Sequence, residues 1–161
     1  MSTFSYKLIN EESVSAVTAT PSVQVGTRRL ADGREYIYAY NDGGIANKGA
    51  PVIMTAVSGY SFVKTYATAA DTSVAFLGIL HNATCAAGSY AWVCTRGVCD
   101  AYCDANAVIA GDNLTIVDGG GAFRVYTYTS SLTQIVAAGV MLRALGTLAG
   151  TASGPVAVLL R

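Results

Sequence analysis

Hydrophobic and polar side chains alternate with a two-residue period in residues 33–40, GREYIYAY. In a β-strand this period turns one arginine and three tyrosines to the same face, namely Arg34, Tyr36, Tyr38 and Tyr40. The side chains between them, such as Ile37, turn to the other face. The pattern predicts a strand with a tyrosine-rich face, and the later stretch FRVYTYT repeats it with Arg124, Tyr126 and Tyr128.

Strand signals continue through most of the chain. Thr, Val, Tyr and Ile are abundant, 17 glycines interrupt the apolar runs, and few segments have a helical period. Residues 53–57 and 60–66 flank a Ser-Gly pair and predict a hairpin with a tight turn. Residues 113–117 and 122–129 flank the segment DGGG and predict a second hairpin of the same design.

The two hairpins belong to an internal repeat. Ile53 aligns with Leu114 and Phe62 with Phe123. Each hairpin is followed by an apolar segment that contains glycine, then by a loop and a closing strand. We therefore predict two duplicated β units, approximately residues 48–97 and 108–161, joined by a linker at residues 98–107.

The N-terminal residues 1–30 differ from the rest. They are rich in Ser, Thr and Val, and they lack a clear pattern of hydrophobic partners. We expect an extended arm here, with an edge strand added to the main sheet as the alternative. Residues 31–161 are expected to form one β domain. The predicted fold class is all-β, a small β-barrel or β-sandwich built from the two duplicated units.

The chain carries very little charge. Only 12% of its residues are charged, about half the usual fraction of a globular protein, and the formal net charge is zero. Surface charge keeps proteins apart, so we expect other protein subunits to cover much of this surface. The neutrality argues against a nucleic-acid partner, because phosphate binding needs an excess of basic residues.

The sequence also contains no apolar run typical of a membrane-spanning helix or of a secretory signal. The longest apolar candidate, residues 135–150, is short, contains Arg143 and is interrupted by glycine, so we expect no membrane partner. The first residues, MSTFSYKLINEE, lack the apolar run of a secretory signal. We therefore expect synthesis in the cytoplasm.

Four cysteines lie close together in the sequence: Cys85, Cys94, Cys99 and Cys103. Zinc sites typically use pairs of ligands in tight knuckles, and no C-x-x-C pair is present. A disulfide between Cys94 and Cys99 is sterically conceivable, but in a reducing cytoplasm it forms only after release. We expect buried thiols in the core, with no metal and no cofactor.

The single histidine, His81, precedes Cys85 by four residues. A cysteine activated by a nearby histidine can act as a nucleophile, so one hypothesis is a small enzyme that uses these two residues. A lone histidine at the end of an apolar strand is more often structural, and the familiar nucleophile, zinc-protease and phosphate-loop motifs are missing from this sequence. Asp104 and Asn106 fit a calcium loop only in part. We expect a protein without catalysis.

Three interpretations of the tyrosine-rich face compete. Exposed aromatic rings can stack on sugars or bases, aromatic rings can fill a core, and interfaces between proteins are enriched in Tyr and Arg. The interface interpretation also accounts for the low charge. We therefore predict an interface made of Arg28, Arg29, Arg34, Tyr36, Tyr38, Tyr40, Arg124, Tyr126 and Tyr128.

Two segments of the chain resemble head and decoration proteins of tailed phages. The first is VGTRRLADGREYIYAYNDGGIANKGAPVIM (25–54), with its DGREY strand and Gly-Gly turn. The second, AAGVMLRALGTLAGTASGPVAVLLR (137–161), is similar to the closing segment of small capsid-binding β proteins. The resemblance implies a capsid decoration, or cement, protein. Such proteins are commonly trimers on the outside of the expanded head, where they clamp neighbouring major capsid subunits.

The hypothesis from the sequence is therefore a structural virion protein that binds the major capsid protein and other copies of itself. The N-terminal arm would strap onto a neighbour, and Arg28, Arg29 and Arg34 would face acidic capsid surface. The alternative is a carbohydrate- or receptor-binding β module of a phage tail or fibre. The two hypotheses predict opposite surroundings for the tyrosines, buried against protein or lining a wet groove.

Overall fold

A computed structural model gives the fold of the chain. The structure describes nine ranges of residues: 13–44, 46–54, 61–63, 76–81, 84–104, 107–116, 121–126, 142–149 and 153–160.

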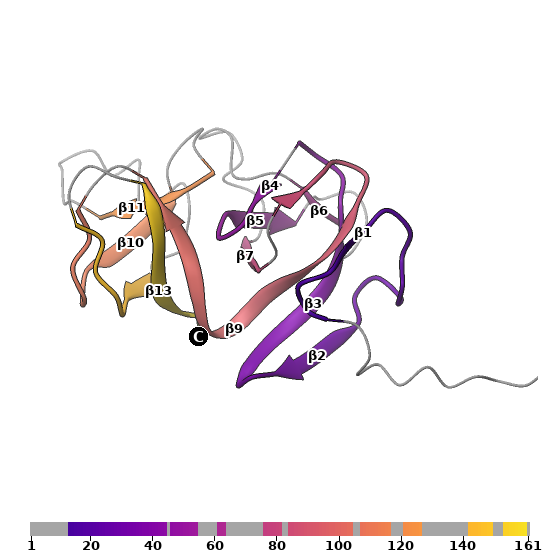
Figure 1. The fold of residues 1–161 in the computed structure, drawn as a ribbon, viewed down its shortest axis with the longest axis horizontal. Helices are drawn as coiled ribbons and strands as arrows, with labels where there is room; N and C mark the ends of the chain where they lie inside the picture. The colour runs from indigo at the N-terminus through magenta and orange to yellow at the C-terminus, as the bar shows by residue number, and fades with distance from the viewer. Residues whose placement is uncertain are drawn as a thin grey trace, which may run out of the picture.

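The described residues form an all-β protein, as predicted, and contain no helix (Figure 1). None of them belongs to a helix long and apolar enough to cross a membrane. The strands are β1 (Val17–Thr18), β2 (Arg28–Ala31), β3 (Arg34–Asn41), β4 (Ala46–Asn47), β5 (Pro51–Met54), β6 (Ser61–Val63), β7 (Phe76–Leu80), β8 (Thr84–Cys85), β9 (Tyr90–Cys103), β10 (Asn113–Ile116), β11 (Phe123–Val125), β12 (Leu142–Ala144) and β13 (Gly154–Leu160).

The first barrel closes through five strands. β5 pairs antiparallel with β6 and with β7, β7 pairs antiparallel with the first half of β9, and that half pairs antiparallel with β3. A parallel pairing of β3 with β6 completes the ring. The hairpin predicted around residues 53–66 is therefore confirmed in its two strands, while its turn lies outside the described residues.

The second barrel repeats this pattern of pairings. β10 pairs antiparallel with β11 and with β12, β12 pairs antiparallel with β13, and β13 pairs antiparallel with the second half of β9. A parallel pairing of β11 with β9 completes the ring. The two rings therefore have the same pattern of strand pairings. The internal duplication itself stays a prediction.

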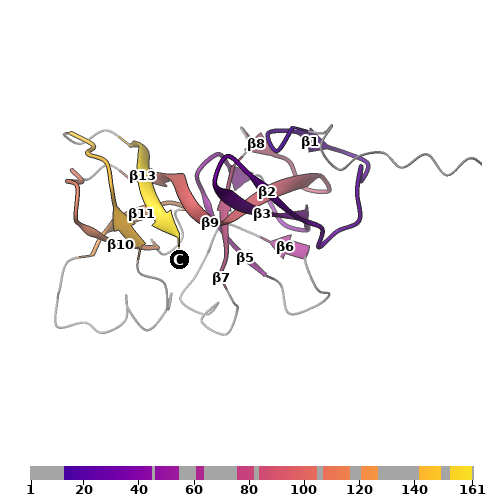
Figure 2. The same ribbon diagram turned by 90° about the horizontal axis from the view of Figure 1, so that it is seen from below.

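Strand β9 belongs to both barrels, and this corrects the predicted boundaries. Its first half, from Tyr90 to Arg96, pairs with β3, and its second half, from Gly97 to Cys103, pairs with β13. Figures 1 and 2 show the strand bending as it passes from one barrel to the other. The predicted linker 98–107 is thus wrong over its first part, because the second unit needs those residues as a barrel strand.

The described part of the N-terminal arm packs on its own chain. β2 pairs antiparallel with β3, and β1 pairs antiparallel with β9. Thr18 Oγ1 lies 2.8 Å from the Tyr38 hydroxyl, and Ser22 Oγ donates to the same oxygen at 3.2 Å. From residue 13 onward the prediction of an extended arm is therefore wrong, and the edge-strand alternative holds. Residues 1–12 lie outside the described residues.

One hydrophobic cluster runs through both barrels. It joins large side chains of the first barrel, such as Tyr38 and Trp92, with those of the second, such as Phe123 and Val158. A smaller cluster, which includes Ile37 and Val93, occupies the other face of the first barrel's strands. Continuity of the core makes the two barrels one packed body.

Candidate functional site

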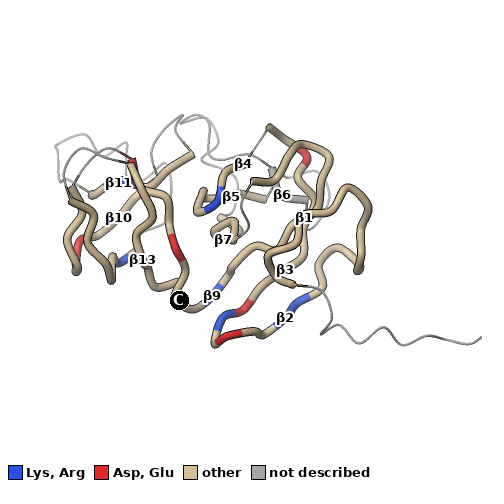
Figure 3. The backbone as a smooth tube through the Cα atoms, viewed as in Figure 1, with Lys and Arg blue, Asp and Glu red and all other residues tan. Residues whose placement is uncertain are grey.

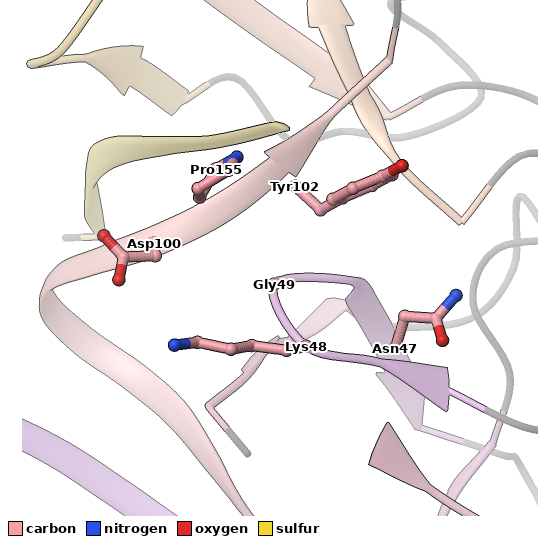
Figure 4. Close-up of a pocket in the computed structure, with 6 residues that line it drawn as sticks. All are labelled: Asn47, Lys48, Gly49, Asp100, Tyr102 and Pro155. Atoms are coloured by element: carbon pink, nitrogen blue, oxygen red, sulfur yellow. The ribbon is translucent and has the colours of Figure 1, made fainter. Parts of the chain in front are cut away.

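A cleft opens where the two barrels meet. It has a volume of about 410 Å³ and is lined by Asn47, Lys48, Gly49, Asp100, Tyr102 and Pro155 (Figure 4). Its first three lining residues come from β4 and the turn that leads into β5, in the first barrel. The other three come from the second half of β9 and from β13, in the second barrel. The bend of β9 therefore creates the cleft.

Gly49 brings the two walls of the cleft into backbone contact. The Tyr102 amide donates to the Gly49 carbonyl at 2.9 Å, and the Gly49 amide donates to the Leu80 carbonyl at 2.8 Å. Gly49 has a φ of +80°, and a Cβ atom there would lie 2.6 Å from the Tyr102 nitrogen. Only glycine meets both requirements, because it lacks the Cβ atom and tolerates a positive φ.

The polar groups of the cleft are suited to binding. Lys48 and Asp100 are exposed and lie at one end, while Asn47 and Tyr102 lie at the other (Figure 4). They provide an ammonium group, a carboxylate, an amide and a phenol, with Pro155 as an apolar surface. Such a set can hold a polar chain or a protein loop by hydrogen bonds and ion pairs.

Side-chain and steric contacts hold the bend of β9 in place. Arg34 Nε of β3 donates to the Val98 carbonyl, and Thr95 Oγ1 donates to the Glu35 carbonyl at 3.2 Å. At the bend, Gly97 has a φ of +100°, and a Cβ atom there would lie 2.9 Å from the Gly33 carbonyl oxygen. The β2–β3 hairpin therefore supports the bend from one side.

His81 lies at the end of β7 and contacts Tyr36. Their ring centroids are 5.1 Å apart in an edge-to-face arrangement. The pKa of His81 is lowered from its ordinary value, first by burial and then by the positive charges of Arg34 and Lys48. The imidazole is therefore held in its neutral form near pH 7, and its ring packs against an aromatic neighbour.

The predicted tyrosine interface is wrong for two of its members. Tyr36 and Tyr38 are fully buried within this chain, where Tyr38 packs against Trp92 with ring centroids 5.0 Å apart. They belong to the core, and no groove or second subunit can reach them. Tyr40 is half-buried and contacts the Tyr90 ring at 5.0 Å. The opposite face of β3 is buried too, which the sequence pattern alone does not reveal.

The predicted arginines do not form one surface. Arg28 is exposed on β2 and forms an ion pair with Glu35 at 2.7 Å, while Arg29 on the same strand is half-buried. Arg124 lies on β11, in the second barrel, and pairs with Asp104. Tyr126 is half-buried near that strand. Tyr128 lies outside the described residues.

The cysteines divide into one disulfide and two free thiols. Cys94 and Cys99 are joined, so the expectation of four free thiols is wrong for this pair. Cys85 and Cys103 are free and buried, as expected. Burial raises the pKa of Cys85 and raises that of Cys103 to about 12. Both thiols are therefore protonated at neutral pH, a state that disfavours nucleophilic attack.

The described residues contain no group of three or more His, Cys, Asp and Glu side chains placed to hold a metal ion. Sequence reasoning did not single out the cleft. Two signals in the sequence point towards it: Gly49 in a turn before an apolar strand, and Gly97 inside a long run of strand-forming residues. A glycine inside a strand pattern often marks a bend or a close backbone approach. Comparison with protein-family models and with curated proteins finds no match to this chain.

Proposed function

We propose that this chain is a non-enzymatic structural protein of a phage virion. It would bind the outside of the capsid and clamp neighbouring major capsid subunits, with other copies of itself as further partners. The proposal places the protein on the assembled virion after synthesis in the host cytoplasm. Its work is adhesion, so it requires no cofactor.

The observation that carries this proposal is the low charge of the chain. With 12% charged residues and no net charge, the chain has weak electrostatic protection against association. The continuous core adds a second argument, since it makes the two barrels one packed body. A body with two lobes can contact two capsid subunits at once, and separating the subunits would then require breaking one of the contacts.

The decisive experiment adds purified protein to phage heads assembled without it and images the particles by cryo-electron microscopy. We expect ordered density on the outer head surface and heads that rupture at a higher temperature than untreated heads. A variant in which Lys48→Asp is combined with Asp100→Lys keeps the net charge and tests whether the cleft faces the shell. If the protein does not add to the heads, or adds only to tails, the proposal fails.

A second candidate is a carbohydrate- or receptor-binding module, and the cleft is the observation that favours it. Tyr102, Asn47 and Asp100 combine a ring with hydrogen-bonding side chains, as sugar sites do. The tyrosine stripe no longer supports this candidate, because Tyr36 and Tyr38 are buried.

Glycan-array binding, followed by titration of any hit against the Tyr102→Ala variant, tests this candidate. A sugar that binds in the cleft should lose about fivefold or more in affinity when the ring is removed, because stacking on an aromatic side chain contributes about 1 kcal/mol or more. Unchanged affinity in this variant would place the sugar elsewhere.

A further inference from the structure

Strand β2 forms one end of the main sheet. It pairs with β3 on one side, and the strand order of the described sheet stops there. The β2–β3 hairpin is closed by Asp32 and Gly33, whose φ angles of +51° and +71° suit a two-residue turn of the kind that connects twisted strands. Figure 1 shows β2 at the rim of the molecule, with no described element beyond it.

The register shows which backbone groups of β2 point away from the strands that the structure describes. In the β2–β3 pair, Arg29 lies opposite Tyr36 and Ala31 lies opposite Arg34 across the two-residue turn. The Tyr38 amide donates to the Thr27 carbonyl at 2.9 Å, so Thr27 and every second residue after it bond to β3. The N–H and C=O groups of Arg28 and Leu30 therefore point away from the sheet.

The outer edge of β2 carries an exposed apolar side chain, which is unusual for a strand at the end of a sheet. Leu30 is 78% exposed, the most exposed of the large hydrophobic residues described. A free edge normally carries features that discourage pairing, and an exposed leucine beside unpaired backbone groups favours it instead. Charged residues of this hairpin and of β9 gather along the same rim (Figure 3).

The segment Arg28–Asp32, RRLAD, is complementary to itself when two copies run antiparallel about Leu30. In that register Leu30 faces Leu30 of the second copy and Arg29 faces Ala31. Arg28 comes to lie beside the turn that holds Asp32 of the second copy. Apolar groups meet and opposite charges meet twice, once on each side of the axis. A register centred on Arg29 would set two arginines directly opposite one another, which is unfavourable.

We propose that β2 binds β2 of a second copy of this chain about a two-fold axis at Leu30. The two Leu30 residues would exchange a pair of backbone hydrogen bonds, and the main sheets of the two copies would become continuous. The contact area is small, so the dimer should be weak and concentration-dependent. A two-fold contact also differs from the trimers that the phage resemblance implies, and it does not depend on capsid binding.

The test uses two charge variants of Leu30 and analytical ultracentrifugation of the purified chain without capsids. Leu30→Glu and Leu30→Lys should each weaken dimerisation about tenfold or more, because like charges would meet across the axis. An equimolar mixture of the two variants should restore a dimer by pairing opposite charges. Leu30→Lys also faces Glu35 within its own hairpin, so it should fold normally.

A matched control and a backbone variant sharpen the result. Ile109 is another exposed apolar residue, at 62%, and Ile109→Glu should leave association unchanged. Leu30→Pro removes the outward N–H group together with the leucine side chain, breaks no hydrogen bond to β3, and should weaken the dimer, with circular dichroism confirming the fold. A wild-type chain that stays monomeric up to about 1 mM, or an oligomer that all Leu30 variants leave intact, would overturn the proposal.

Discussion

His81 is the only histidine of the chain, and its surroundings keep it neutral. Its imidazole is half-buried, lies edge-to-face on Tyr36, and is close enough to Arg34 and Lys48 to be affected by their charges. A group with a lowered pKa in the folded state binds fewer protons there than in the unfolded chain. His81 therefore links folding stability to pH, although nothing in its geometry requires catalysis.

We predict that the free energy of unfolding decreases as the pH falls below about 6.5, the ordinary pKa of histidine. The unfolded state takes up the proton first, so the stability is complete above this pH and is lost as the pH falls towards the lowered pKa of the folded state. Urea unfolding between pH 5 and 7.5 measures the effect. His81→Gln should flatten the dependence, and a slope that persists in this variant would assign it to another group.

The residues of β3 show why the alternating pattern led to a wrong prediction of an exposed tyrosine face. The alternation in β3 correctly separates Tyr36 and Tyr38 from Ile37 and Ala39. Alternation usually indicates one solvent-exposed face, but here both faces are buried, because the main cluster covers one face and the smaller cluster covers the other. The polar phenol group of Tyr38 does not indicate exposure to solvent. Its hydroxyl forms hydrogen bonds with Thr18 and Ser22 of the arm, so the ring can be buried.

At the scale of elements, β9 organises the molecule. A single strand serves as the last strand of one barrel and the first strand of the next, and it turns at Gly97. The disulfide from Cys94 to Cys99 spans this turn, with one cysteine in each half of the strand. Both cysteines are buried in the shared core. The disulfide therefore ties the first barrel to the second at the bend.

We predict that replacing both cysteines with alanine lowers the melting temperature by about 4–8 °C. Closing so short a loop removes chain entropy worth about 2 kcal/mol from the unfolded state. Differential scanning calorimetry measures the shift, and the reduced wild-type chain, which should also melt lower, serves as the comparison.

Counting thiols provides an independent check on the disulfide. Alkylation of the denatured, unreduced protein should label only Cys85 and Cys103, which mass spectrometry can show. Labelling of all four cysteines in protein purified under oxidising conditions would contradict the assignment.

On the scale of the whole molecule, the continuous core predicts that the two barrels unfold together. Phe123 of the second barrel is fully buried in the same cluster as Tyr36 and Trp92 of the first. Loss of packing in one barrel should therefore weaken the other, which would not happen if each barrel had a separate core.

We predict that Phe123→Ala destabilises the protein by about 3–5 kcal/mol and reduces protection from hydrogen exchange in both barrels, β3 included. Hydrogen exchange followed by mass spectrometry resolves the two barrels. Val52→Ala, in the smaller cluster, is the matched change within the first barrel. If Phe123→Ala loosens β10 to β13 and leaves β3 fully protected, the barrels are independent.

The sequence by itself determined the all-β class and the paired strands of the two hairpins. These follow from local signals, since a two-residue period and glycine turns are written in neighbouring residues. The low charge, which supports the proposed association with other proteins, is equally a property of composition.

Only the tertiary structure decided which strands pair with one another and that β9 belongs to both barrels. Residues 98–103 looked like a linker because their pairing partners, Gly154 to Leu159, lie far along the chain. The cleft at Gly49 and the edge at Leu30, which is free among the described strands, have the same origin, because each depends on which distant strands lie beside it. Strand pairing is a long-range interaction, and a local pattern specifies the faces of a strand without specifying its neighbours.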